Sequence, residues 1–369
     1  MKSQRSSGGC AGIRLVNNEN GLILIAVLTL LTALTLAGVT AFIVASTDVK
    51  VGGNFKTSQT GLQVAMAGAE QARETLRAAN ASSTNPANFS EELAAYISSP
   101  LASSSTLVSG YAYSASLAND SAVGETSTTD INGKVVITSV ATGPNNAKAA
   151  VQIVVKLFTG ASSPATIYSK GDVTGNGSSL TINGNDECGE ESGLAPIYTK
   201  SPAATNLNGS PTLSGSPSTP QSGNLDIGIQ EMINALKGSA AYTLTEDTNN
   251  ATYGTSTSYK TVYSNTNNPP NVNGLTLNNL TGYGLLLIEG DLVLGGGFTW
   301  YGPILVTGSV TLNGGGGGIN IHGQILSGTS TLTDVTINGG NVINYNSCDI
   351  KKAFAGQPLT VVNWKQNLY

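Results

Sequence analysis

An uninterrupted apolar segment from Leu22 to Ala45 limits what this chain can fold into more than any other feature of the sequence. No charged residue occurs in it, and the next one along the chain is Asp48. A helix of these 24 residues is about 36 Å long, which is enough to cross the hydrocarbon core of a bilayer. The apolar region of a cleavable signal peptide is shorter, about 7–15 residues. The segment therefore predicts a transmembrane helix over 22–45. An ordinary signal anchor is one possible interpretation of this helix.

The residues before the apolar segment predict its orientation. Lys2, Arg5 and Arg14 precede it against a single acid, Glu19. Positive charge holds that end of a membrane helix in the cytoplasm. We therefore expect a single-pass protein with its N-terminus in the cytoplasm and the chain from about Ser46 outside the membrane.

The composition is that of an exported, β-rich body. Only 11% of the 369 residues are charged, and 45 are glycine. The formal net charge of −5 becomes −7 without residues 1–21, because those residues carry three basic side chains and one acidic one. An acidic body without a basic stripe argues against a nucleic-acid partner. More than 300 residues outside the membrane are enough for a sizeable core, and we expect two domains there.

The stretch "NENGLILIAVLTLL" and the residues after it resemble the N-terminus of type IV pilins and pseudopilins, in which a basic leader ends in glycine before a long apolar helix. The resemblance implies that a prepilin peptidase cuts between Gly21 and Leu22 and removes the leader 1–21. A second stretch, "KVGGNFKTSQTGLQVAMAGAEQARETLRAA", is similar to the PilX-type minor pilins. The matching residues are Gly53, Asn54, Ala65, Met66, Ala69 and Glu70.

One position departs from the general pilin pattern. Most pilins carry Glu at the fifth mature residue, where it is thought to pair with the N-terminal amine of a neighbouring subunit, and this chain has Ala26 there. A carboxylate in an apolar bundle is costly unless it is paired, so a subunit without one loses a docking contact and avoids that cost. The departure argues against a major subunit and favours a rare, priming or tip-located one, with other minor pilins and the major pilin as its expected partners.

The pattern after the membrane segment predicts a long helix over 22–79 followed by antiparallel strands over 80–158. Apolar residues from Phe55 to Leu76 recur at steps of three, four and seven, which is one face of a helix. The segments "VVITSV" and "VQIVVKLF" are the clearest strands, and turn residues separate them. A helix packed on an antiparallel meander is also what the pilin resemblance implies.

Residues 159–369 predict a Gly-rich, β-solenoid-like domain. "GLLLIEGDLVL" from Gly284 aligns with "GPILVTGSVTL" from Gly302, and "GQILSG" from Gly323 continues the repeat. A β-sandwich with similar hairpins is the alternative. Residues 185–275 contain a helix-like segment and a polar, Tyr-containing stretch, so we expect an insertion there. The fold class predicted for the chain is therefore α+β.

Two cysteines, Cys188 and Cys348, lie outside the leader, where disulfides persist, and they most simply pair with each other. Two separate thiols are the alternative. Cys10 lies in the leader with no apolar stretch before it, so it does not indicate lipid attachment.

The search for catalytic chemistry finds little. His322 is the only histidine, and in "INIHG" it alternates with isoleucines, as a surface residue does. Four acids between 186 and 191, Asp186, Glu187, Glu190 and Glu191, have oxygen ligands that Ca²⁺ prefers, yet their spacing is that of a solvated acidic turn. We therefore predict no catalytic residues, no metal site and no cofactor, and the question of Ca²⁺ at this turn stays open.

Together these observations predict a structural minor pilin that takes part in the assembly of a type IV pilus or pseudopilus. We expect it in the inner membrane before assembly and then in the extracellular or periplasmic filament, at the tip. Two alternatives stay open: a tip adhesin that binds a surface or glycan, and a membrane-anchored solenoid enzyme acting on polysaccharide. Between Gly284 and Asn346 the only charged residues are Glu289, Asp291 and Asp334, which counts against the enzyme.

Overall fold

The computed structural model describes residues 19–108, 110–158, 163–177, 179–266, 274–329 and 333–368. The chain divides into two compact units, Met1–Thr60 and Gly61–Tyr369. Each unit is described by itself below.

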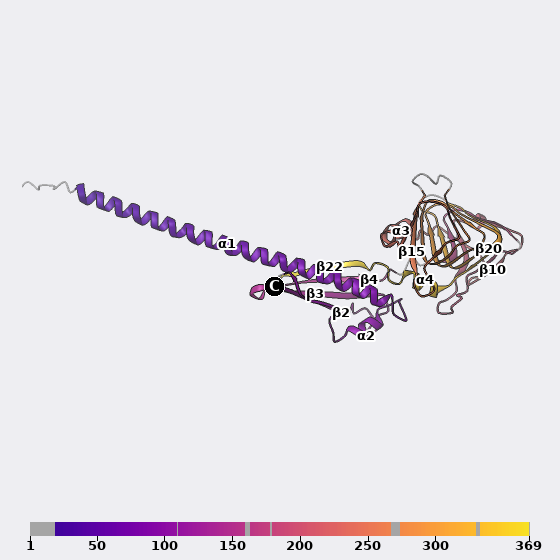
Figure 1. Ribbon diagram of the computed structural model, residues 1–369, viewed down its shortest axis with the longest axis horizontal. Helices are drawn as coiled ribbons and strands as arrows, with labels where there is room; N and C mark the ends of the chain where they lie inside the picture. The colour runs from indigo at the N-terminus through magenta and orange to yellow at the C-terminus, as the bar shows by residue number, and fades with distance from the viewer. Residues whose placement is uncertain are drawn as a thin grey trace, which may run out of the picture. The chain divides into compact units, whose positions relative to one another are not determined.

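The first unit consists of the N-terminal part of one long helix, α1 (Glu19–Asn80), which Figure 1 shows as a continuous coil. Its apolar side chains are exposed, with Leu22 and Phe42 each at 75%. The helix is long and apolar enough to cross a membrane. Threonines within it, such as Thr29 and Thr40, donate their hydroxyls to carbonyls of the preceding turn, so the apolar segment satisfies its own polar groups.

In the second unit, the C-terminal part of α1 packs on a five-stranded antiparallel sheet. The strand order is β1-β2-β3-β4-β22. The strands are β1 (Ala102–Val108), β2 (Tyr111–Asn119), β3 (Lys134–Thr142), β4 (Lys148–Lys156) and β22 (Thr360–Leu368). A short helix, α2 (Ser90–Tyr96), lies between α1 and β1, and a 3-10 turn (Pro144–Asn146) connects β3 to β4.

Small side chains bring α1 close to this sheet. Ala65, Ala69 and Ala72 are at most 2% exposed, and they pack in one core with Ile137 and Ile153 of the sheet. The inward residues of β3 alternate with half-buried ones, as expected for a sheet with one covered face. The sequence pattern of an apolar helix face followed by alternating strands is therefore satisfied by one helix–sheet layer pair.

The larger sheet has 17 strands, all paired in parallel. Its first group is β5 (Ala165–Ser169), β6 (Val173–Asn176), β7 (Thr181–Asn183), β8 (Ala195–Thr199), β9 (Thr205–Asn208), β10 (Thr212–Ser214) and β11 (Gln221–Ser222). Its second group is β12 (Tyr242–Leu244), β13 (Thr248–Asn249), β14 (Thr252–Tyr253), β15 (Lys260–Asn265), β16 (Leu275–Asn278), β17 (Thr281–Glu289), β18 (Leu292–Gly295), β19 (Phe298–Val306), β20 (Val310–Ser327) and β21 (Val335–Asn344).

These strands form three columns of parallel pairs, in which each long strand contributes to more than one column. The first column is β12-β15-β17-β19-β20-β5-β8-β11. The second column is β13-β16-β18-β20-β21-β6-β9. The third column is β14-β17-β19-β20-β21-β7-β10. The side chains between them form one core that includes Phe298 and Trp300.

The strands stack in an order that differs from their order in the chain. Strands β5, β6 and β7, which come first in the chain, pair with β20 and β21, which come last. Strands β11 and β12, which follow each other in the chain, are at opposite ends of the first column. Helix α3 (Ile229–Leu236) and a 3-10 turn (Lys237–Ser239) make the connection between those two ends. The remaining elements are a 3-10 turn (Pro202–Ala204) and helix α4 (Ser347–Phe354).

Two segments, residues 185–275 and β22, pair differently from what we expected from the sequence. The domain limits themselves are not tested by these pairings. Residues 185–275, expected as an insertion, contribute β8 to β15 and the start of β16 to the parallel sheet. Some of these strands have only two residues, and their pairing partners are distant in the sequence. No local sequence pattern therefore predicts them as strands. Strand β22, expected in the solenoid-like domain, pairs instead with β4 in the antiparallel sheet. The parallel sheet is thus an insertion between two adjacent strands.

The first column is apolar on both faces, which explains why "GLLLI" does not alternate. Leu286 and Ile288 point into the core between the columns, whereas Leu285 and Leu287 pack outward against α3 and α4. A strand buried on both sides has a continuous apolar sequence. The aligned repeat has the same register in the structure, where Leu286 pairs with Ile304.

Candidate functional site

The predicted cleavage site lies at the start of α1. Gly21 and Leu22 are in the first turns of the helix, and Ala26 follows one turn later. The leader residues 1–18, including Cys10, lie outside the described residues. Ala26 is exposed, and its side chain is an uncharged methyl group at the position where most pilins carry the carboxylate of Glu. From Leu22 onward the helix therefore presents an apolar surface, which lipid or other apolar helices can cover favourably.

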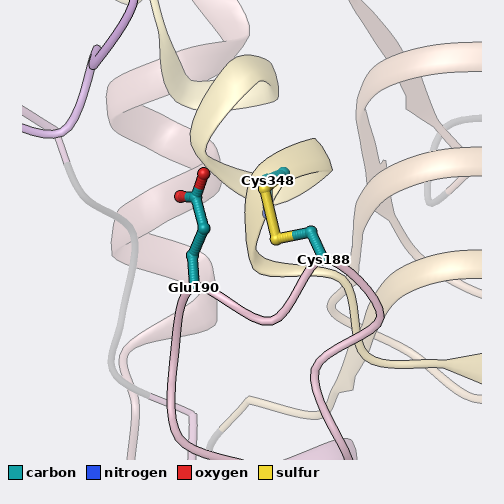
Figure 2. A group of neighbouring side chains, drawn as sticks. All are labelled: Cys188, Glu190 and Cys348. Carbon is teal, nitrogen blue, oxygen red and sulfur yellow. A yellow bond between two sulfur atoms is a disulfide. The ribbon is translucent and has the colours of Figure 1, made fainter.

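A disulfide joins Cys188 to Cys348, with a Cα–Cα distance of 6.1 Å (Figure 2). Cys188 lies in the turn between β7 and β8, and Cys348 lies in the first turn of α4. The bond closes a loop across 160 positions, which contains most of the parallel sheet. In the chain-entropy model a loop of this length stabilises the folded state by roughly 5 kcal/mol.

The carboxylate of Asp186 holds the turn to the start of α4. It accepts hydrogen bonds from the backbone N–H groups of Glu190 and Glu191 at 2.9 Å each and from Ser347 N at 2.8 Å. Burial opposes the charged carboxylate, but the donors, Ser347 first among them, lower its pKa below the ordinary value. Asp186 therefore orders this turn as a charged acceptor, in the way that an N-terminal cap orders a helix.

The other three acids of the turn also have partners within the chain. Glu190 and Glu191 form ion pairs with Lys351 at 3.1 and 2.8 Å. Glu187 accepts hydrogen bonds from the side-chain amides of Asn344 and Asn346. Glu190 also lies beside the two cysteines, as Figure 2 shows, but the sulfurs are bonded to each other. Hydrogen bonds and ion pairs within the protein therefore account for the acidic turn.

His322 belongs to a row of rings on the outside of the third column. Its Nδ1 lies 2.7 Å from a carboxylate oxygen of Glu187, and its ring stacks on Tyr301 at 4.7 Å between centroids. Tyr301 stacks on Tyr283 at 4.4 Å, and Tyr259 contacts Tyr283 edge-on. Stacking within the row therefore occupies both faces of the Tyr301 ring and stabilises the column.

Tyr259, in the polar, Tyr-containing stretch, forms a hydrogen bond with helix α4. Its hydroxyl donates to Asp349 of α4 at 2.5 Å. Burial and this contact raise the pKa of Tyr259. The hydrogen bond ties α4 to the row of rings, which local sequence could not indicate because the partners are 90 positions apart.

Glu289 is a buried carboxylate whose role the sequence did not reveal. It accepts hydrogen bonds from the Tyr263 hydroxyl at 2.5 Å, Gln230 Nε2 at 2.9 Å and Lys237 Nζ at 3.0 Å. Burial opposes its charge, yet these donors lower the pKa of Glu289. Burial next to Glu289 raises the pKa of Tyr263 to about 12. Because Gln230 and Lys237 belong to α3 and to the 3-10 turn after it, Glu289 anchors this connection to the first column.

No protein-family model matches the chain, and no curated protein matches it. Among solved structures, the crystal structure of the competence-associated pilin ComZ from Thermus thermophilus aligns with 85% of this chain and 98% of that chain. The aligned residues are 10% identical and the TM-score is 0.24. At a TM-score this low, the function has to be argued from the chain's own elements.

Proposed function

We propose that this chain is a pilin-like subunit of a type IV pilus or a related filament, anchored in the inner membrane before assembly. The observation that carries the proposal is α1: its exposed apolar part, 22–45, continues without a break into a part that packs on an antiparallel sheet. An apolar segment of this length has two stable environments, a bilayer and a bundle of similar helices. A filament subunit uses both in succession.

A prepilin peptidase cuts the leader between Gly21 and Leu22 in this proposal. The support is the basic leader, the glycine and the apolar segment that follows it. The similarity to PilX-type minor pilins in the stretch from Lys50 to Ala79 supports a minor subunit, and Ala26 supports a position at the tip. Its partners are then other minor pilins and the major pilin.

The test is N-terminal sequencing of the chain extracted from membranes that contain a prepilin peptidase. We expect the sequence to begin at Leu22 in the wild type and the leader to remain in a Gly21→Val variant. Gly38→Val is the matched control, because a side chain at Gly38 meets no atom within 4 Å. An intact leader in the wild type, or a cut after Ala45, contradicts the proposal.

We also propose that the parallel sheet is a β-solenoid and that it has no catalytic function. The solenoid is supported by three columns in parallel register, whose paired residues are 18 to 25 positions apart from β17 to β21. A non-catalytic role is supported by the partners of the acidic turn and by His322, whose ring and Nδ1 are held by Tyr301 and Glu187. The domain then projects from the filament as a stable surface, as it would in a tip adhesin.

A further inference from the structure

The outward side chains of the second column form a regular polar surface. In the strands β16, β18, β20, β21 and β6 of this column, alternate residues point into the core, and those residues are aliphatic or glycine. The end strands β13 and β9 have Thr248 and Thr205 at the corresponding positions. The outward residues form two rows. The first row is Thr276, Val293, Thr311, Thr336, Thr174 and Asn206, aligned by strand register. The second row is Asn249, Asn278, Gly295, Asn313, Asn338, Asn176 and Asn208. We call both rows together the Thr–Asn face.

Hydrogen bonds along the asparagine row keep its amides in line. Asn338 Nδ2 donates to Asn313 Oδ1 at 3.1 Å, and Asn208 Nδ2 donates to Asn176 Oδ1 at 3.2 Å. Each amide has two donors and an oxygen with two lone pairs, so the bonds along the row leave donors and acceptors free on the outer side. Gly295 interrupts the row where a Cβ would lie 1.6 Å from the Asn278 oxygen.

The spacing of this face is set by the sheet. Neighbouring strands are about 4.8 Å apart, and the two rows, two residues apart along a strand, are separated by about 6.6 Å. The polar groups therefore repeat in two directions at distances similar to the size of one sugar ring. A ligand that repeats along the same axis can make the same contact at several coils, and such contacts add up.

The two rows of the Thr–Asn face contain no charged residue, and Asp247, which continues the first row beyond Thr276, accepts a hydrogen bond from Thr276 N at 2.8 Å. The acids at its border are engaged by the neighbouring coil: Asp291 accepts from Ser309 N at 2.7 Å, and Asp334 accepts from Asp172 N at 2.9 Å. Asp172 forms an ion pair with Lys200 at 2.8 Å. A neutral array of hydroxyls and amides complements a neutral, hydroxyl-rich ligand better than a charged one.

A protein ligand fits this face poorly. Protein interfaces depend on buried aromatic and aliphatic anchors, and the two rows offer only the methyl groups of threonine and Val293. Between the end strands β13 and β9, the backbone groups of these strands are paired within the column on both sides, so the face itself cannot add another strand. The other two columns differ, because α3 and α4 cover the first and the row of rings lines the third.

We propose that the Thr–Asn face binds a neutral, extended polysaccharide that lies along the stack of coils. Its hydroxyls exchange hydrogen bonds with the threonine hydroxyls and the asparagine amides of successive coils. This inference goes beyond a role in filament assembly, and its test does not depend on that role.

The test is affinity electrophoresis of the detergent-solubilised full chain in native gels that contain hydroxyethyl cellulose, dextran or alginate. We expect hydroxyethyl cellulose, a neutral β-linked glucan, to slow the wild-type chain. A Thr336→Arg variant should bind about tenfold more weakly, because the long side chain blocks at least one coil's set of hydrogen bonds.

Thr299→Arg is the matched control, because Thr299 is an equally half-buried outward threonine in the third column. It should bind as the wild type does, and circular dichroism should show both variants folded. Slowing by hydroxyethyl cellulose that Thr336→Arg reduces and Thr299→Arg does not supports the proposal. Binding to alginate or dextran alone, no slowing by any polymer, or an equal effect of both variants overturns it.

Discussion

At the scale of single residues, Glu289 shows how a buried charge can be retained where it has enough partners. An unpaired carboxylate in such a place would lose its charge, and here three donors from Tyr263, Gln230 and Lys237 compensate the burial. The residue lies at the end of a strand of the first column and contacts the connection between the two ends of the stack. Its contribution should therefore be measurable as stability of the whole parallel sheet.

We expect a Glu289→Gln substitution to lower the free energy of unfolding by about 2 kcal/mol, since hydrogen bonds to a charged group are lost while the side chain keeps its shape. The folded pKa of Glu289 lies below its ordinary value of 4.5. The advantage of the wild type is therefore complete above the unfolded pKa and disappears as the pH falls through the folded pKa.

Urea unfolding of the detergent-solubilised variants at neutral and acidic pH measures this difference. Glu231→Gln, an exposed position on α3, is the control and should change stability little at either pH. A Glu289→Gln variant as stable as the wild type at neutral pH would show that the carboxylate is not an anchor.

At the scale of elements, the contact between α1 and the antiparallel sheet depends on the absence of a side chain at Gly68. A Cβ there would lie 2.4 Å from the Ser139 hydroxyl oxygen and 2.5 Å from the Tyr113 ring. Both neighbours are buried, so they have little room to move. A glycine in a helix interior normally costs about 1 kcal/mol relative to alanine, and at this place the close approach of the sheet justifies it.

We expect Gly68→Ala to destabilise the second unit by about 1–3 kcal/mol through overpacking. Gly53→Ala is the control, because a Cβ at Gly53 meets no atom within 4 Å and should only improve helix propensity. Thermal unfolding of both variants in detergent, followed by circular dichroism, compares them. If Gly68→Ala were as stable as Gly53→Ala, the helix and the sheet would not be in close contact.

At the scale of the whole molecule, the position of the parallel sheet in the chain bears on where the proposed subunit would lie in a filament. The sheet is inserted between β4 and β22, which are adjacent antiparallel strands. Residues 163–354, from the start of this region to the end of α4, are thus held to the antiparallel sheet by two chain connections. A body of this size would crowd a closely packed shaft but can project freely from a filament end.

We therefore expect few copies of this chain per filament, at or near the tip. Quantitative mass spectrometry of sheared filaments gives the copy number, and antibody labelling in the electron microscope gives the position. An Ala26→Glu variant tests whether the missing carboxylate causes the low copy number. If it does, more copies of the variant than of the wild type should enter the shaft. Even labelling along the shaft at the copy number of the major pilin contradicts this prediction.

The sequence alone predicted the elements whose physical causes are local. The apolar segment 22–45 and the helical spacing after it determine α1, which begins at Glu19 and ends at Asn80. The repeat of "GLLLI" and "GPILV" correctly aligned Leu286 with Ile304, because stacked strands with one register need the same inward side chains at the same positions. The pairing of Cys188 with Cys348 followed from their number and compartment rather than from their positions.

Only the tertiary structure decided which distant segments meet. Strand β22 does not alternate between apolar and polar residues, and nothing within it specifies β4, more than 200 positions earlier, as its partner. Strands as short as β13 and β14 have too few residues to show a period, so they become strands only because β16 and β17 are there to pair with them. The donors around Glu289 likewise come from β15 and from the connection 229–239, and each row of the Thr–Asn face combines residues of several strands. Such contacts depend on the stacking order, which no local pattern of residues encodes.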